Sequence, residues 1–436
     1  MAAGPPSSGR TTPFLRLRRT PAPVRTAKAT KAAKKKATAP AAETIVVRKV
    51  RLYPDAQART TFRKWFGCVR KTYNLALDAL KRRTWKRGVV LKKYWLRDRF
   101  VSARNVPKRH KYLLETPKHV REQAVFDLYE AYASNFAKRR KDPDHRFRIK
   151  FRSRKDNQAI LIPKANVSLD GLRLRVFPTM MKGTVSIKKR SIPVINGIAH
   201  DCRLALDRLG HFYLCVPTTK AAPPAAEDPT TDLSRVVALD PGVRTFQTGY
   251  CPANGVAFKV ADKEGARLFR LMLCLDRLIS RTALRRGNVS RMRKAQERLR
   301  QRIRHLVGEV HWKTIKYLLD RFDIIVIPPF ETSRMSARAT RILTSKTVRS
   351  MTTWAHYTFR TRLQHVATHR GKAVHVLGEE YTTKTCGCCG WLHPKVGGAK
   401  VFSCGQCHAR MDRDGQAARN ILLKSLSHVL ATHALE

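Results

Sequence analysis

CGCCGWLHPKVGGAKVFSCGQCHARMDRD spans residues 386–414 and contains two CxxC pairs, followed closely by two aspartates. Each pair offers two thiolates from one tight turn, and the fourteen residues between the pairs match the spacing of a zinc ribbon. We therefore expect one structural Zn2+ in a closed tetrahedral site formed by Cys386, Cys389, Cys404 and Cys407. Asp412 and Asp414 stand directly after the ribbon, which suggests that it is joined to a second, carboxylate-bearing site.

The chain is strongly basic. Its 436 residues include 89 Lys and Arg against 31 Asp and Glu, which gives a formal charge of +58. Such an excess favours a polyanionic partner, because basic side chains displace counterions from phosphates. No segment has the roughly 20 uncharged apolar residues of a membrane-spanning helix, and no apolar leader stands at the N-terminus. We expect a protein that is neither secreted nor embedded in a membrane.

The first 43 residues read as a basic tail. No acidic residue precedes Glu43, and a segment so rich in Ala, Pro, Ser and Thr cannot bury enough apolar surface to fold alone. We expect residues 1–43 to be disordered. The lysine cluster at 28–36 fits a nuclear-localisation signal or a phosphate-binding arm, and the two roles can coexist. On this basis we expect a nuclear protein.

The periodicity of the chain changes several times after the tail. A strand that ends at Pro54 is followed by helical stripes of aromatic and aliphatic residues at 62–80 and 125–136, which favour core packing over base stacking. Short strands between 147 and 217 are broken by Gly, Pro and Asn and predict a small barrel. A Pro-rich and Ala-rich linker follows.

Two aspartates stand where a carboxylate can reach a cleft. Asp240 ends the apolar strand 235–240 and is followed by Pro-Gly, and carboxylates at such strand ends hold pairs of hard cations in metal-dependent nucleases. Asp414 begins a predicted helix. Each residue also has a plainer explanation, since Asp often opens a turn and often caps a helix.

Read together, these segments resemble one family. Leu239-Asp-Pro-Gly-Val-Arg-Thr-Phe246, Tyr381-Thr-Thr-Lys-Thr-Cys386 and the Asp412-Arg-Asp-Gly-Gln-Ala-Ala-Arg-Asn-Ile421 tail of the ribbon are similar to motifs of TnpB-type proteins. These are transposon-encoded, RNA-guided nucleases related to type V CRISPR effectors. The resemblance is greatest to their eukaryotic and giant-virus branch, the Fanzor proteins. It implies a RuvC-like domain of the RNase H type, with Asp240 as the first catalytic acid and Asp414 as the last.

The middle catalytic acid departs from the common family pattern. Most TnpB-like proteins carry a glutamate directly at the end of the third strand, but this strand ends in Pro328-Pro329, and Glu331 comes three residues later than expected. The Fanzor branch resembles this chain, because its glutamate is relocated to the strand before the ribbon. The matching residue here is Glu379, which we favour over Glu331 and then Glu380. Alternatively, Glu379 and Glu380 are a solvated pair and the nuclease is inactive.

The resemblance implies a multidomain α+β protein. We expect a disordered tail at 1–43, a wedge-type β-barrel at 44–60 and 147–217, an inserted helical recognition domain at 61–146, a linker at 218–234, and a nuclease domain at 235–436 with the zinc ribbon at 382–411.

The function that the resemblance implies is RNA-guided cleavage of double-stranded DNA. A guide RNA would read the sequence by base pairing, and the catalytic acids would hold two Mg2+ ions for phosphodiester hydrolysis. The protein in the RNA complex is expected to be a monomer. Two alternatives stay open: a guided DNA-binding protein that has lost cleavage, and a zinc-ribbon DNA-binding protein that uses no guide.

Overall fold

The computed structural model describes residues 44–82, 91–220, 232–285, 287–337, 343–378, 380–394 and 399–434. The chain divides into two units at Ala221. The predicted tail at 1–43, residues 221–231 of the predicted linker, and Glu379 lie outside the described residues.

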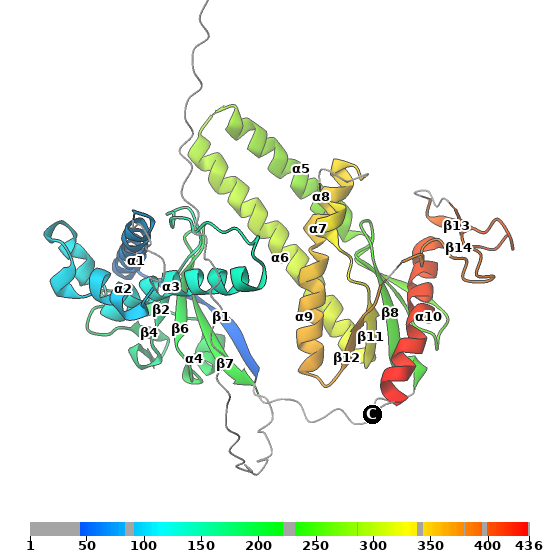
Figure 1. Ribbon diagram of the computed structural model, residues 1–436, viewed down its shortest axis with the longest axis horizontal. Coiled ribbons are helices and arrows are strands. Elements are labelled where there is room, and N and C mark those ends of the chain that lie inside the picture. Colours follow the sequence, from blue (N-terminus) through cyan, green and yellow to red (C-terminus); the bar gives the residue numbers. More distant parts are fainter. Residues whose placement is uncertain are drawn as a thin grey trace, which may run out of the picture. The chain divides into compact units, whose positions relative to one another are not determined.

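The first unit is built on a seven-stranded antiparallel sheet (Figure 1). In spatial order its strands are β2 (Gln158–Ile162), β6 (Cys202–Leu206), β7 (Phe212–Lys220), β1 (Thr44–Pro54), β5 (Val185–Ser186), β4 (Arg173–Val176) and β3 (Val167–Asp170). The edge strands β2 and β3 do not pair with each other in the described part of the chain. The strands thus form a barrel-like sheet with an open seam.

Helices stand between β1 and β2 in this unit. They are α1 (Ala56–Arg82), α2 (Lys93–Phe100), the 3-10 turns η1 (Ala103–Asn105) and η2 (Lys108–Glu115), and α3 (Lys118–Lys141). Three short elements come later in the unit: η3 (Lys164–Asn166) after β2, and η4 (Lys189–Ser191) and α4 (Ile192–Asn196) after β5. The helical stripe predicted for α1 faces the core, since Phe62, Trp65 and Leu77 are at most 1% exposed. The rings of Phe62 and Phe212 lie 5.5 Å apart, which joins α1 to β7.

The second unit is built on a five-stranded mixed sheet. Its spatial order is β10 (Ala257–Val260), β9 (Gln247–Tyr250), β8 (Val236–Pro241), β11 (Ile324–Ile327) and β12 (Ala373–Val376). Strand β9 runs antiparallel to both β10 and β8, whereas β11 runs parallel to β8 and β12 runs parallel to β11. The central strand β8 thus stands between an antiparallel half and a parallel half.

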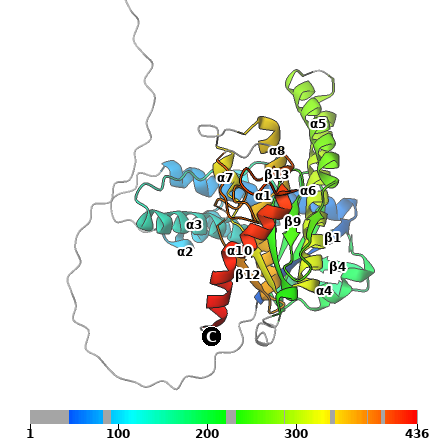
Figure 2. The same ribbon diagram turned by 90° about the vertical axis from the view of Figure 1, so that its right-hand side faces the viewer.

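The remaining elements of this unit surround the sheet. They are η5 (Leu233–Arg235), α5 (Glu264–Ala283), α6 (Val289–Arg321), α7 (Thr332–Met335), α8 (Ser345–Trp354), α9 (His356–Thr368), the hairpin β13 (Val401–Ser403) and β14 (Arg410–Asp412), and α10 (Arg413–Ala434). Helix α10 covers one face of the sheet, and α6 and α9 cover the other (Figures 1 and 2).

Alternation along the strands divides the core between these two faces. Val236 and Ala238 of β8 pack with Ile421 and Leu422 of α10, while the intervening Val237 packs toward α6 and α9. Strand β8 is therefore buried on both sides, as its unbroken apolar sequence requires.

Candidate active site and zinc site

Asp240 lies on the α10 face at the carboxyl end of β8. The strand positions 236, 238 and 240 share one face because side chains alternate with a period of two, and Val236 and Ala238 contact α10. Asp240 is partly buried, although the four residues before it are fully buried. The strand therefore places this carboxylate at the end of the sheet where β8 finishes.

The turn that follows Asp240 is held in place by α8 and α9. A Cβ at Gly242 would lie 2.5 Å from the carbonyl oxygen of Thr245, so the turn needs glycine there. The His356 Nε2 lies 3.1 Å from the Gly242 carbonyl oxygen, and the Trp354 indole N–H donates to the Val243 carbonyl at 3.0 Å. Burial lowers the pKa of His356 to about 3, so the ring is neutral and its Nε2–H can donate. The sequence carried no signal for this support.

Asp414 lies in the first turn of α10. Helical spacing places it on the same side of the helix as Ala417, Ala418 and Ile421, which are buried against the sheet. Its carboxylate is 3.4 Å from the Arg413 guanidinium and is one third exposed. The first and last predicted acids therefore lie on the same face of the sheet, which α10 covers.

Asp412 has the helix-capping role that the sequence analysis considered for Asp414. Its Oδ1 accepts the backbone N–H groups of Asp414 and Gly415, both at 3.0 Å, and thus caps α10. Its Oδ2 accepts a hydrogen bond from Lys259 Nζ at 2.6 Å, and this bond raises the pKa of Lys259. The two aspartates of the Asp-Arg-Asp motif are therefore engaged differently.

Pro328 follows directly after β11, which pairs in parallel with β8. Val326 pairs with Ala238, and Pro328 and Asp240 each come two residues later. Phe330 then has a φ of 40°, and its ring lies 4.7 Å from that of His356 in α9. Glu331 is exposed and precedes α7, where its carbonyl accepts the N–H of Met335.

Glu380 is tied to the middle of α10. Its carboxylate lies 2.6 Å from Lys424 Nζ, and the hydrogen bond between them lowers the pKa of Glu380. Lys424 is ten residues beyond Asp414, or about 15 Å along the helix at 1.5 Å per residue. Glu380 is therefore not brought together with Asp414. The preferred middle acid, Glu379, falls outside the described residues.

The four predicted cysteines converge. The Cys386 and Cys407 sulfurs are 3.7 Å apart, and those of Cys389 and Cys404 are 3.6 Å apart. All four lie within 4.8 Å of one another, and in the described ranges no other group of three or more Cys, His, Asp or Glu is so arranged. A tetrahedron with Zn–S bonds of about 2.3 Å has edges of about 3.8 Å. The thiols therefore fit the predicted Zn2+.

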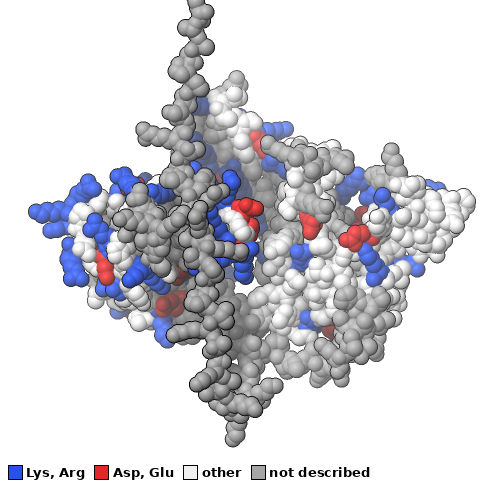
Figure 3. Space-filling view, viewed as in Figure 1, with Lys and Arg blue, Asp and Glu red and all other residues white. Residues whose placement is uncertain are grey.

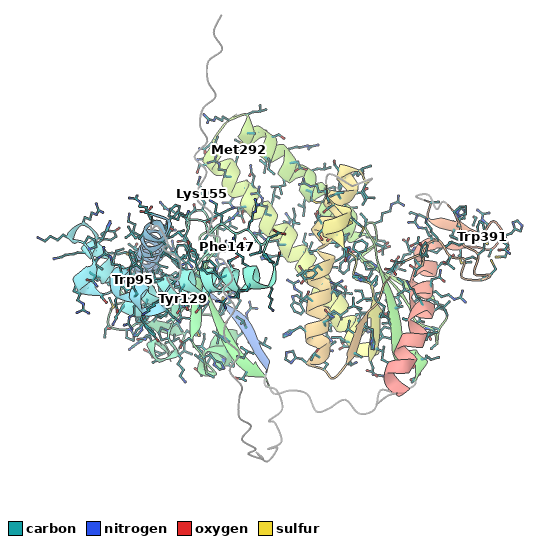
Figure 4. The ribbon with its side chains drawn as sticks, in the orientation of Figure 1. Trp95, Tyr129, Phe147, Lys155, Met292 and Trp391 are labelled. Carbon is teal, nitrogen blue, oxygen red and sulfur yellow. The ribbon has the colours of Figure 1, made fainter. Side chains whose placement is uncertain are left out.

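The surroundings of Cys404 also suit a thiolate. Desolvation alone would raise the pKa of Cys404, but backbone N–H groups of Cys407 and Gln406 donate to its sulfur and lower the pKa to about 6. Cys386 and Cys404 are buried with Phe402, and the partly buried Trp391 packs against them (Figure 4). The ring of Trp391 lies so close to Gly405 that a Cβ there would approach it to 2.9 Å.

The segment that enters the ribbon is fastened to α10 by polar side chains. The buried Asn420 donates its Nδ2 to the carbonyl oxygens of Thr382 and Thr385, each at 2.8 Å. Gln416 also donates to Thr385, and Arg419 donates to the carbonyl oxygen of Gly387 at 2.6 Å. The motif that contains Asp414 therefore also fixes the position of the ribbon.

The elements and sites described so far define a class of protein: an α+β protein with two carboxylates on one face of a mixed sheet and a four-cysteine hairpin that leads into one of them. Two family models match parts of the chain, a Cas12f1-like TNB domain at residues 356–421 and a helix-turn-helix domain of the IS605 OrfB type at 47–88.

Similar proteins extend the match over most of the chain. A "Putative transposase" of Paramecium bursaria Chlorella virus 1 is 30% identical over 409 residues, which cover 89% of each chain. A "TnpB-like protein" of Acanthamoeba polyphaga mimivirus is 27% identical over 192 residues, 42% of this chain and 36% of that one. A "Putative RNA-guided DNA endonuclease" of Streptomyces pristinaespiralis is 24% identical over 387 residues, 87% of this chain and 89% of that one. The chain belongs to the TnpB/IS605 OrfB family of transposase-like proteins.

A Cas12f1 chain solved with sgRNA and target DNA has 12% identity and a TM-score of 0.43, and the match covers 87% of this chain and 98% of that one. This likeness is too distant to bear on the arrangement of the parts. No helix within the described segments is long and apolar enough to cross a membrane.

Proposed function

We propose that this protein is an RNA-guided endonuclease that cuts double-stranded DNA complementary to a bound guide RNA. The observation that carries the proposal is that Asp240, at the carboxyl end of the central strand, and Asp414, in the first turn of α10, lie on the same face of the sheet. The name of the Streptomyces relative supports the same activity. The strand order, with three antiparallel strands followed by two parallel ones, is the order expected for an RNase H-type sheet.

Asp240, Asp414 and a middle glutamate are the proposed ligands of two Mg2+ ions. Carboxylate oxygens are the ligands that Mg2+ prefers. Bound there, the ions would activate water and stabilise the leaving oxygen. The protein would orient the carboxylates. Strand β8 and the turn after it, which His356 supports, hold Asp240, and the capped first turn of α10 holds Asp414.

We propose Glu379 as the middle acid. Strand β12, whose Ala373 packs against the core on the α10 face, ends three residues before Glu379 in the sequence. The position that this glutamate usually has, directly after the third strand, is occupied here by Pro328. Glu380 is engaged by Lys424, and Glu331 follows Phe330, whose ring packs against His356 of α9, the helix on the opposite face from α10. These contacts favour Glu379 and agree with the resemblance to the Fanzor branch.

The four-cysteine cluster is proposed to hold one Zn2+ that folds the ribbon. Four thiolates leave no open position for a substrate, so the ion is structural. The ribbon would then hold Asp414 in place, because its second cysteine pair lies in the turn between β13 and β14, and β14 ends at Asp412.

Guide RNA and double-stranded DNA are the proposed partners. Lysine and arginine side chains cover much of the visible face of the first unit (Figure 3). Exposed aromatics stand among them: Tyr94 and Trp95 on α2 are 62% and 41% exposed, and Tyr112 of η2 is 45% exposed (Figure 4). Aromatic faces among cations suit nucleobases and phosphates.

The domain roles proposed for the first unit follow the sequence analysis. Its sheet would be the wedge domain, with α1–α3 as the recognition domain. The protein would act as a monomer in the RNA complex, inside the nucleus.

The test of guided binding begins with the RNA that co-purifies with the protein. Sequencing that RNA defines its variable end. A set of DNA duplexes complementary to this end, each with a different flanking sequence, is then tested, and we expect binding. RNase treatment should abolish binding. Binding that survives RNase would instead identify the guide-independent alternative, and guided binding without cutting in Mg2+ would identify the inactive one.

A further inference from the structure

Lys259 shares a row of the second sheet with Asp240. Asp240 pairs with Thr248 across β8 and β9, and Thr248 pairs with Lys259 across β9 and β10. Residues directly opposite one another in an antiparallel sheet project to the same face. The neighbouring row identifies this face, because Tyr250 packs with α10 and Ala257 lies against Gly415.

The carboxylate of Asp412 joins this row to the start of α10. One oxygen accepts a hydrogen bond from the ammonium of Lys259 at 2.6 Å. The other accepts the N–H groups of Asp414 and Gly415. The same side chain thus caps the helix and links its first turn to the edge strand β10.

Asp414 depends on the orientation of this first turn. It is the second residue of α10, and its own N–H is one of the two that Asp412 accepts. The turn lies close to β10, since a Cβ added at Gly415 would be 3.0 Å from the Cβ of Ala257. A rotation of this turn would therefore swing the Asp414 carboxylate relative to Asp240.

Lys259 also balances the charge at this end of the sheet. Without a cation, Asp412 and Asp414 would place two negative charges at one helix terminus. The ammonium of Lys259 is about two fifths exposed and pairs with Asp412, whereas the cation beside Asp414 is Arg413 at 3.4 Å.

We infer that Lys259 is a positioning residue for Asp414: it holds the Asp412 carboxylate in the orientation that caps α10 and thereby sets the direction of the last acid. Its effect on cleavage rests on the proposed function, but its effect on the first turn of α10 does not. The two consequences can therefore be measured separately.

The first measurement is amide hydrogen exchange across residues 410–418 of the purified protein–RNA complex. Lys259→Met should speed exchange by roughly three- to fivefold, because a weakened cap loosens the first turn of the helix. Lys259→Arg should restore protection. The matched control is Lys313→Met, which breaks an exposed pair with Glu309 at 2.9 Å on α6 and should leave this segment unchanged.

The second measurement is the Mg2+ dependence of DNA cleavage by the same variants. We expect Lys259→Met to raise the half-saturating Mg2+ concentration at least about threefold, with a smaller loss of rate at saturation and recovery in Lys259→Arg. Exchange in Lys259→Met equal to that of wild type would overturn the inference. If the wild-type complex cuts no DNA, the proposed function fails, and the exchange result still decides the role of Lys259.

Discussion

Three glutamates near the carboxyl ends of β11 and β12 compete for the role of the middle acid, and substitution of each can decide between them. Glu379→Ala should reduce cleavage by about a thousandfold, because a metal contributes several kcal/mol and each ~1.4 kcal/mol is a factor of ten. Glu331→Ala and the matched neighbour Glu380→Ala should each keep activity within about threefold, since Glu331 follows a residue that packs on α9 and Glu380 pairs with Lys424. Rates are measured with guide and Mg2+ saturating. Full activity in Glu379→Ala would refute the assignment.

His356 gives the second unit a pH-dependent stability. Its pKa is lowered to about 3 by burial, so the unfolded chain binds a proton near pH 6.5 that the folded chain does not. The stabilisation that comes from keeping His356 neutral is complete above about pH 6.5. It is lost as the pH falls toward the pKa that His356 has in the folded chain. Between pH 7 and pH 5 this loss is about 2 kcal/mol. The buried His311, whose pKa burial lowers to about 4, adds a similar loss.

Urea unfolding at the two pH values measures these losses. His356→Gln should lose about half of the wild-type change in the free energy of unfolding between the two pH values, because only the contribution of His311 remains. His305→Gln, at an exposed position on α6, should retain all of it. An equal pH dependence in wild type and His356→Gln would contradict the burial argument.

The two aspartates of the proposed site were recognisable in the sequence, but the residues that support them were not. Asp240 and Asp414 each stand in a motif, beside an apolar strand or an Ala-rich helix. Lys259 is 153 positions from Asp412, and His356 is 114 positions from Gly242. Contacts between such distant residues leave no local trace in the sequence.

At the scale of elements, sequence periodicity was a good guide where one face of a helix is buried. The stripe of α1 packs in the core as expected, and the strands that end at Asp240 and before Pro328 are present. The relation between the ribbon and α10 could not be predicted. It depends on Asn420 reaching two backbone carbonyls 35 and 38 residues away, and an Asn on a helix has many other uses.

The ribbon should lose its metal when one ligand is removed. Cys404→Ser should lower bound zinc from about one ion per chain to none, since a closed structural site needs all four ligands. Cys388→Ser is the matched control, because this exposed thiol lies between two ligands and outside the cluster. Zinc content is measured by native mass spectrometry. Equal zinc in both variants would argue against the four-cysteine site.

At the scale of the whole molecule, the charge of +58 indicated a polyanionic partner before any motif was considered. Composition could not distinguish RNA from DNA, and the resemblance to TnpB proteins supplied that distinction. The family relation is shown by the viral relative that matches 89% of the chain. The nuclease activity is our proposal, which is supported by the position of Asp240 and Asp414 on one face of the sheet.

The most direct measurement of that proposal is cleavage of DNA by the purified protein–RNA complex in Mg2+. Two duplexes are compared, one complementary to the variable end of the bound RNA and one scrambled, each with varied flanking sequence. We predict cuts in the complementary duplex alone, and their loss in Asp240→Asn and Asp414→Asn with DNA binding retained. Binding without any cut by the wild-type complex, or cuts that persist in both Asp variants, would contradict the account.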